Sequence, residues 1–228
     1  MAPSEPARPI AVVYRDAWTG PDDGDDTGAM AAMLTRSPWN FEIVIAGPDG
    51  DLPVREALAG ADVRLYGQPG GAGDDESAFR RQKRDKSAIR QFVAAGGRYL
   101  GICMGAFLAE PGFFNIFPGR ADEYHSSKGA AVTTADPALV EVDWRGQRRA
   151  MYFQDGAFLV PKRRAEATVL ARYATGSIAA LVSRHGAGRV ALCGPHPEAP
   201  PAWYDNAGLR YPGPTQDLAD DLITTLMA

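Results

Sequence analysis

A cysteine in a glycine-rich corner has the clearest chemical potential in this sequence. Cys103 lies between Gly101 and Gly105, after an apolar run and before a helical pattern. Glycines two residues before and two after a nucleophile allow the strained strand-to-helix turn of a nucleophile elbow, which lifts the side chain above a sheet. The turn also puts the sulfur at a helix N-terminus, where the helix dipole favours the thiolate that attacks carbonyl carbon. The pattern therefore predicts a nucleophile, and a small buried cysteine in a glycine turn is the alternative.

A base for this cysteine can come from one of only three histidines. His196 follows an apolar run over 189–193, so it stands at the end of a predicted strand, as Cys103 does. The His-x-Glu spacing lets Glu198 reach back to the imidazole and fix its tautomer, so that the other ring nitrogen faces the thiol. We interpret His196 as a base and Glu198 as its orienting group. A structural histidine in a proline-rich turn is the alternative.

Acyl chemistry also needs hydrogen-bond donors for the oxyanion that develops on the carbonyl oxygen. The N–H of Met104 at the start of the elbow helix is one candidate. The N–H of Gly71 in Pro69-Gly70-Gly71 is the other, because this turn ends a neighbouring strand. A simple glycine turn is the alternative. Three strand ends that converge on one edge favour the functional interpretation.

The first half of the chain alternates strands and helices. Compact apolar runs predict strands at 10–14, 41–46, 63–66 and 98–102. Helical spacing predicts a first helix capped by Thr27 and two more at 54–59 and 77–86. A fourth predicted helix carries Ile89, Phe92 and Val93 and ends at 96–97. This alternation predicts an α/β fold, flavodoxin-like, with an open and mainly parallel sheet and helices on both faces. Ligands bind such sheets at the carboxyl ends of the strands.

The second half predicts added antiparallel strands. They are expected at 131–134, 139–144, 149–153, 168–173, 178–184 and 189–193, with a hairpin turn at 185–188, followed by a helix at 215–227 whose apolar face carries Leu218, Leu222, Ile223 and Leu226. We find no internal repeat and no linker. The chain is therefore predicted to form one domain over 1–228, with a flexible N-terminal segment over 1–9.

Composition excludes several function classes. A net charge of −4 and a pI near 5.4 offer no global attraction to nucleic acid. No apolar run approaches the roughly 20 residues that span a membrane, and the first residues lack an apolar signal core. Two cysteines 90 residues apart form neither a disulfide framework nor a zinc pattern. We expect a cytoplasmic protein that binds a small-molecule substrate or metabolite, with no metal, no cofactor, no nucleic acid and no membrane.

Together the motifs resemble a known superfamily. Pro-Gly-Gly at 69–71, Gly-Gly-x-Tyr-Leu-Gly-Ile-Cys-x-Gly-Ala at 96–106 and His-Pro-Glu at 196–198 are similar, in that order, to the class I glutamine amidotransferase-like superfamily. The branch they resemble most is named for the N-terminal domain of biotin-protein ligases. The resemblance runs from the first strand through Glu198 and implies a Cys103, His196 and Glu198 triad with an oxyanion hole at Gly71 and Met104.

The same resemblance suggests where substrate binds. Residues 151–156 look like the aromatic hairpin near the site of this branch, which makes Tyr152 and Gln154 candidate substrate contacts together with Gly70 and Phe107. Core packing is the alternative for the aromatic side chains. The superfamily's frequent dimers suggest a homodimer, and delivery of ammonia to a partner synthetase in trans stays open.

Two departures shape the function that we expect. Glutamine-using members carry Gln four residues after the cysteine, where this chain has Phe107, and a protease-like branch places His directly after the cysteine, where this chain has Met104. We expect a cysteine-dependent hydrolase or acyl-transfer enzyme that acts on a small amide or related carbonyl substrate through a thioester. The alternative is a non-catalytic module that binds a ligand or partner without glutaminase activity. A fold that uses nearly the whole chain would leave no room for a ligase domain, so biotin ligase activity is not expected.

Two further features have mainly structural interpretations. Cys193 precedes the His196 loop and is expected to be a packing cysteine, with regulatory oxidation as the alternative. The acidic loop over 22–26 lacks the ligand spacing of a calcium hand and is expected to be a solvated turn, although it follows the first strand and so lies near the ligand edge.

Overall fold

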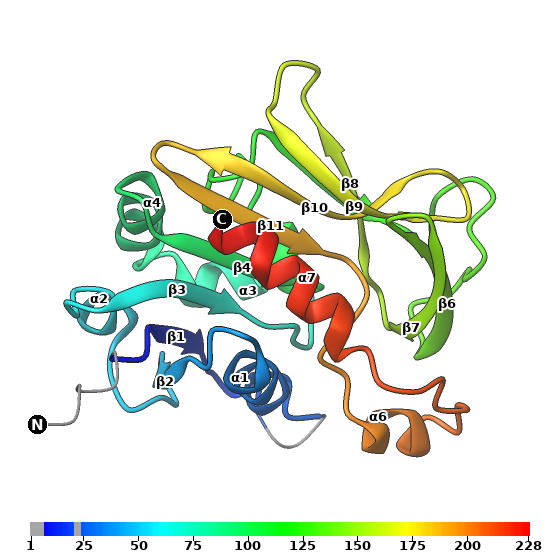
Figure 1. The fold of residues 1–228 in the computed structure, drawn as a ribbon, viewed down its shortest axis with the longest axis horizontal. Helices are drawn as coiled ribbons and strands as arrows, with labels where there is room; N and C mark the ends of the chain where they lie inside the picture. Colours follow the sequence, from blue (N-terminus) through cyan, green and yellow to red (C-terminus); the bar gives the residue numbers. More distant parts are fainter. Residues whose placement is uncertain (1–6, 21–23) are drawn as a thin grey trace, which may run out of the picture.

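Eleven strands form one sheet whose two halves run differently (Figure 1). The computed structural model describes residues 7–20 and 24–228. The parallel half has the order β2-β1-β3-β4-β11, and its strands are β1 Ile10–Tyr14, β2 Glu42–Ala46, β3 Val63–Gln68, β4 Arg98–Ile102 and β11 Gly188–Cys193. This is the flavodoxin-like strand order, with the last parallel strand supplied by β11.

The antiparallel half continues the sheet from β11. Its strands are β5 Gly119–Glu123, β6 Ala138–Trp144, β7 Gln147–Phe153, β8 Ala157–Pro161, β9 Ala167–Tyr173 and β10 Ile178–His185. Strand β10 pairs with β11, and β9, β6 and β7 follow outward, while β8 pairs with both β10 and β5. In Figure 1, β10 lies beside β11, and β6, β7, β8 and β9 lie to the upper right of the parallel strands. All of β5 to β10 is therefore inserted in the sequence between β4 and β11, which are neighbours in the sheet.

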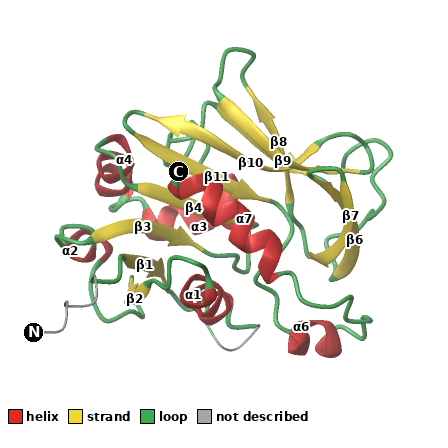
Figure 2. Cartoon of the chain, in the orientation of Figure 1, coloured by secondary structure: helices red, strands yellow, loops and turns green. Residues whose placement is uncertain are grey.

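Helices cover both faces of the parallel half (Figure 2). One face holds α1 Asp26–Arg36 and α7 Gln216–Met227, the other holds α2 Val54–Ala57, α3 Asp75–Gln82, α4 Lys86–Ala94 and α5 Met104–Leu108, and α6 Pro201–Asn206 follows the His196 loop. The strands alternate accordingly, with Ala11 and Val13 in the core beneath α1 and α7, and Val12 and Tyr14 in the opposite core. None of the helices in the described ranges is long and apolar enough to cross a bilayer.

Most predicted elements of the parallel half are confirmed. The strands at 10–14 and 98–102 match residue for residue, and the others differ by one or two residues at an end. The predicted Thr27 cap is wrong, because the Asp25 carboxylate caps α1 by accepting the N–H of Gly28 at 2.8 Å. Thr27 lies inside the first turn, where its hydroxyl donates to the Tyr14 carbonyl at 2.8 Å. The predicted helix over 77–86 is wrong in extent, because the chain turns at 83–85 between α3 and α4.

Three errors fall in the antiparallel half. Residues 131–134 form no strand, whereas β5 and β8 were not predicted. Strand β5 carries Arg120, Asp122 and Glu123 in five residues, so its sequence has no apolar run, and pairing with β8 supplies the missing stabilisation. The hairpin turn is confirmed, since β10 ends at His185 and β11 begins at Gly188. Residues 1–6 of the predicted flexible segment, and Asp22 and Asp23 of the acidic loop, lie outside the described residues.

Candidate active site

A cavity of about 940 Å³ opens at the carboxyl ends of the parallel strands. Trp18 follows β1, Gly71 follows β3, Cys103 follows β4 and His196 follows β11, and all four side chains or backbones line it. Strand β5 and the residues after β7 close the opposite wall. The lining also includes Asp26, residues 72–75, Met104, Phe107, residues 121–123, Ser126, Ser127, Ala135, Gln154, Asp155 and Phe158. The predicted nucleophile and the predicted base therefore line the same cavity, at the carboxyl ends of the parallel strands.

The elbow at Cys103 has the backbone that the two glycines were expected to allow. Cys103 has a φ of 51° and a ψ of −109°, an unfavourable conformation for a residue with a side chain. A Cβ atom at Gly101 would collide with the Gly105 carbonyl, and one at Gly105 would collide with the Gln68 carbonyl at the end of β3. Strand β4 and helix α5 can therefore meet this closely only because neither glycine has a side chain. The tight turn keeps the sulfur at the start of α5.

Two contacts hold the Cys103 residue in place. Its backbone N–H donates to the Cys193 carbonyl of β11 at 2.9 Å, which extends the β4 to β11 pairing by one residue. Its thiol donates to the Gln154 carbonyl at 3.4 Å. The cysteine is therefore anchored by β11 on one side and by the chain after β7 on the other.

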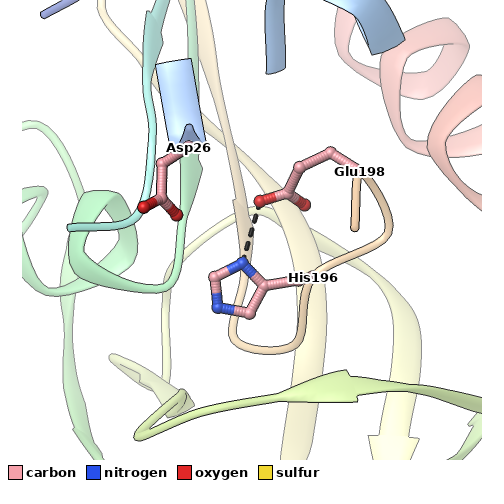
Figure 3. A group of neighbouring side chains, drawn as sticks. All are labelled: Asp26, His196 and Glu198. Atoms are coloured by element: carbon pink, nitrogen blue, oxygen red, sulfur yellow. Dashed lines mark hydrogen bonds and ion pairs between the residues drawn. The ribbon is translucent and has the colours of Figure 1, made fainter. Parts of the chain in front are cut away.

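His196 is held by contacts from three segments. Its Nδ1 lies 2.9 Å from Glu198 Oε1, shown as the dashed line in Figure 3, and its backbone N–H donates to the Tyr152 carbonyl at 2.9 Å. The rings of Tyr152 and Trp203 pack edge-on against the imidazole, with centroids 5.7 Å and 5.5 Å away. Both His196 and Glu198 are buried, at 4% and 3% exposure. With Nδ1 engaged by Glu198, Nε2 is the nitrogen left for chemistry.

The surroundings of His196 favour its charged form. Burial alone would lower the pKa of the imidazole, but the charges of Glu198 and Cys103 and hydrogen bonding to both outweigh it, so the pKa is raised well above its ordinary value. A charged imidazole beside a cysteine stabilises the thiolate.

Asp26 belongs to the acidic loop that was expected to be a solvated turn, and for this residue that expectation is wrong. It is the first residue of α1, it lines the cavity, and it approaches His196 from a different direction than Glu198 does (Figure 3). Burial is the main cause that raises its pKa to about 7, and the charges of Glu198 and Asp25 act in the same direction while His196 opposes them. The available signal was its position, after the first strand and at the start of a helix.

Gly70 makes room for this arrangement. A Cβ atom there would collide with Asp26 Oδ1 and come within 3.0 Å of His196 Cε1. Gly70 itself is not among the residues that line the cavity within the described ranges. Its position indicates a spacing role between Asp26 and His196 rather than contact with substrate.

Asp26, His196 and Glu198 also form the group that could hold a metal ion. Each offers one ligand atom, and these atoms lie within 4.8 Å of one another. The described residues provide no hydrogen-bond partner for the buried Glu198 Oε2. A metal ion on His196 Nδ1 would displace the bond to Glu198, and one on Nε2 would occupy the nitrogen that is left to act as a base.

The remaining predicted residues divide by position. Gly71, Met104, Phe107 and Gln154 line the cavity. Across 7–20 and 24–228, the N–H groups of Gly71 and Met104 donate no hydrogen bond in a turn, loop or cap, which leaves both available to an oxyanion. Tyr152 is not among the lining residues; its hydroxyl donates to Oε1 of Gln154, which does line the cavity, at 3.1 Å.

Cys193 is a fully buried free thiol in the core. Burial and the charges of Glu198 and Cys103 raise its pKa well above the ordinary value, so the protonated thiol is favoured. Such a thiol packs rather than reacts. The position supports the interpretation of Cys193 as a packing cysteine.

Comparison with known proteins agrees with this topology. Residues 114–224 match the family described as "Biotin-protein ligase, N terminal". A glutamine amidotransferase of Thermotoga maritima superimposes with a TM-score of 0.58 at 12% identity, over 97% of each chain. This chain has a class I glutamine amidotransferase-like fold. Over residues 114–224 it is similar to the N-terminal domain of biotin-protein ligases.

Other proteins that this chain is similar to carry less functional information. Cytoplasmic protein STM1381 of Salmonella typhimurium LT2 superimposes with a TM-score of 0.56 at 14% identity, over 95% of this chain and 98% of that one. An uncharacterized protein of Chlamydia muridarum is 28% identical and covers 72% of each chain. The fold also matches parts of glycosidases; for example, it spans only 29% of the β-galactosidase Gan42B, with a TM-score of 0.54 and 12% identity.

Proposed function

We propose that this amidotransferase-like chain is a cysteine-dependent hydrolase or acyl-transfer enzyme that acts on a small amide or related carbonyl compound. Cys103 is the nucleophile, His196 the acid and base, and Glu198 the group that orients the imidazole. The N–H groups of Gly71 and Met104 bind the oxyanion. The observation that carries the proposal is an elbow cysteine and a Glu-held imidazole on the wall of one cavity.

The reaction follows from this geometry. The Cys103 thiolate attacks the carbonyl carbon, and the electron pair of the C=O bond moves to oxygen. The C–N bond then breaks, the imidazolium gives its proton to the leaving nitrogen, and a thioester remains on Cys103. Water or an amine gives a proton to His196 as it attacks the thioester, and the sulfur leaves as thiolate. The imidazolium and thiolate are restored for the next turnover.

Phe107 favours a substrate other than glutamine. Its side chain lines the cavity four residues after the nucleophile, where glutamine-using members of the superfamily carry an amide side chain. A phenyl ring cannot donate or accept the hydrogen bonds that hold a glutamine amide. The same observation supports a second candidate function, a binding module that retains the cavity without turnover.

Alkylation of Cys103 separates the two functions without a known substrate. In a Cys193→Ala background with a single thiol, we would measure the rate with iodoacetamide from pH 5 to pH 9. An enzyme thiolate paired with His196 should react at pH 6 within about tenfold of its rate at pH 9. An ordinary thiol, with a pKa of about 8.5, is ionised to well under 1% at pH 6 and should slow by about 100-fold.

The matched variant is His196→Asn in the same background. We expect it to lose about 100-fold of the rate at pH 6 and little at pH 9, because the imidazolium that stabilises the thiolate is gone. Equal rates at pH 6 for the parent and the His196→Asn variant would contradict the proposed enzyme and favour the binding module.

A further inference from the structure

We infer that the substrate carries a positive charge, as an ammonium or guanidinium group attached to the amide or carbonyl compound. The inference rests on the proposed function, and it concerns the cavity in which Cys103 lies. It draws on three features of the wall: its charge, an acidic side chain beside His196, and its aromatic surfaces.

The wall of the cavity is acidic. Its six carboxyl side chains belong to Asp26, Asp74, Asp75, Asp122, Glu123 and Asp155. Among the residues that the structure describes, no lysine or arginine lines the cavity. Carboxylates that face one concave surface with low-dielectric walls concentrate the field and attract cations into it.

Basic side chains nearby do not neutralise the whole set. Arg120 pairs with Asp122 at 3.0 Å on the exposed side of β5, and His125 Nδ1 lies 3.0 Å from Asp155. Arg81 bonds Asp16 at 2.9 Å and stacks over one face of Trp18, so its guanidinium group is already engaged by these two residues and is not part of the lining. Asp74 caps α3 through Ser77, and its pKa is lowered by that hydrogen bonding, so it keeps its negative charge.

Asp26 is the acidic side chain of the wall that lies beside His196. Its carboxyl group makes no hydrogen bond or ion pair with a side chain of the described residues, although one of its oxygens lies within 4.8 Å of a ring nitrogen of His196. An ammonium or guanidinium group in the cavity would provide the missing partner and favour the carboxylate.

Aromatic side chains line the cavity together with the carboxylates, and both kinds of group bind organic cations. Trp18, Phe107 and Phe158 all line the cavity. The side chain of Trp18 is large and apolar, yet it is 47% exposed. Aromatic faces attract alkylammonium and guanidinium groups, an attraction that inorganic anions and carboxylates do not share. The volume of about 940 Å³ suits a small organic molecule rather than a metal ion alone.

Charged thiol reagents test this without a substrate. In the Cys193→Ala background we would compare two methanethiosulfonates of similar size, one with a trimethylammonium group and one with a sulfonate group. The Cys103 thiolate attacks the sulfenyl sulfur, a mixed disulfide forms and methanesulfinate leaves. Each rate is divided by the rate with a free small thiol under the same conditions.

We expect Cys103 to prefer the cationic reagent by at least tenfold at low ionic strength, and the preference to shrink in 1 M salt. The double variant Asp122→Asn/Glu123→Gln should reduce the preference by several-fold. The matched control, Glu141→Gln/Glu166→Gln, removes two exposed charges outside the cavity lining and should leave the preference unchanged.

The outcomes separate the two proposals. Fast reaction of Cys103 at pH 6 with no preference, or with a preference for the sulfonate reagent, overturns the cationic substrate and leaves the enzyme intact. Slow reaction at pH 6 with iodoacetamide contradicts the enzyme itself. An equal loss of preference in the cavity and control variants would assign the effect to net charge and overturn the inference as well.

Discussion

Asp26 destabilises the fold to hold an acidic side chain in the cavity. Since its folded pKa of about 7 lies above the unfolded value of 3.8, the folded state binds the proton more tightly. Stability is therefore lost as pH rises from about 4 to about 7. A group that opposes folding, yet lies within 4.8 Å of the predicted base, is typical of a functional site.

Asp26→Asn should stabilise the protein above neutral pH. Asparagine cannot ionise, so at pH 8 we expect a gain of up to about 4 kcal/mol, since the pKa shift spans about three units and each unit corresponds to about 1.4 kcal/mol. At pH 4 the two proteins should differ little, because both side chains are neutral there. Urea unfolding of both proteins at the two pH values measures this. A gain that is the same at both would show that Asp26 does not titrate as described.

Glu198→Gln should separate orientation from charge at His196. The glutamine oxygen can still accept from Nδ1, but the negative charge that raises the imidazole pKa is gone. We expect the alkylation rate of Cys103 at pH 6 to fall by about tenfold, less than in His196→Asn. An unchanged rate at pH 6 would mean that the carboxylate charge does not support the ion pair.

At the scale of elements, the elbow depends on close contact between α5, β4 and β3. A side chain at Gly105 would collide with the Gln68 carbonyl, and backbone cannot move aside as a flexible side chain can. Gly105→Ala should cost about 1 to 3 kcal/mol and displace Cys103. Gly112→Ala is the matched control, since Gly112 is exposed and a Cβ there meets nothing within 4 Å. Thermal unfolding together with Cys103 alkylation measures both effects, and equal behaviour of the two variants would contradict this account of the turn.

The sequence predicts the elements of the parallel half better than those of the antiparallel half for a physical reason. Strands β1 and β4 are buried on both faces, so they appear as continuous apolar runs with clear ends. Strand β5 is defined by its partner β8, a contact between segments far apart in the sequence. Local patterns do not contain that information.

The candidate site divides in the same way. Cys103, Gly101 and Gly105 were predictable because a strained corner imposes residue types at fixed spacing. Asp26 was not, because its importance comes from the distance to His196, and a single acid at a helix start is commonly just a favourable charge. Gly70 was chosen as a substrate contact, whereas its lack of a side chain serves the approach of Asp26 to His196.

At the scale of the whole molecule, the sheet and α7 connect the two halves. Strand β11 pairs with β4 on one side and β10 on the other, and Asp221 of α7 accepts from Trp144 Nε1 at 2.8 Å at the end of β6. We predict that the 228 residues unfold as one domain. Calorimetry should give a single transition whose calorimetric and van't Hoff enthalpies agree. Two separable transitions would contradict the one-domain organisation.

Asp221→Ala should weaken the whole fold rather than one end. It leaves the indole N–H of the buried Trp144 without its partner and removes the ion pair with Arg145 at 2.7 Å. We expect a loss of about 1 to 3 kcal/mol in urea unfolding, with the transition still single. Asp220→Ala removes only a contact with Gln216 on the same helix and should cost less. Equal losses would show that the bridge to β6 adds nothing.

The insertion of β5 to β10 between β4 and β11 also sets when the site can act. A ribosome releases the elbow cysteine early, with the strand and helix that shape it, but the histidine and glutamate emerge only after the whole inserted half. Until β11 enters the sheet, the Cys103 N–H lacks the Cys193 carbonyl that anchors it. A growing chain therefore carries its thiol without a base, and the proposed reactive pair can form only after the whole inserted half has been synthesised.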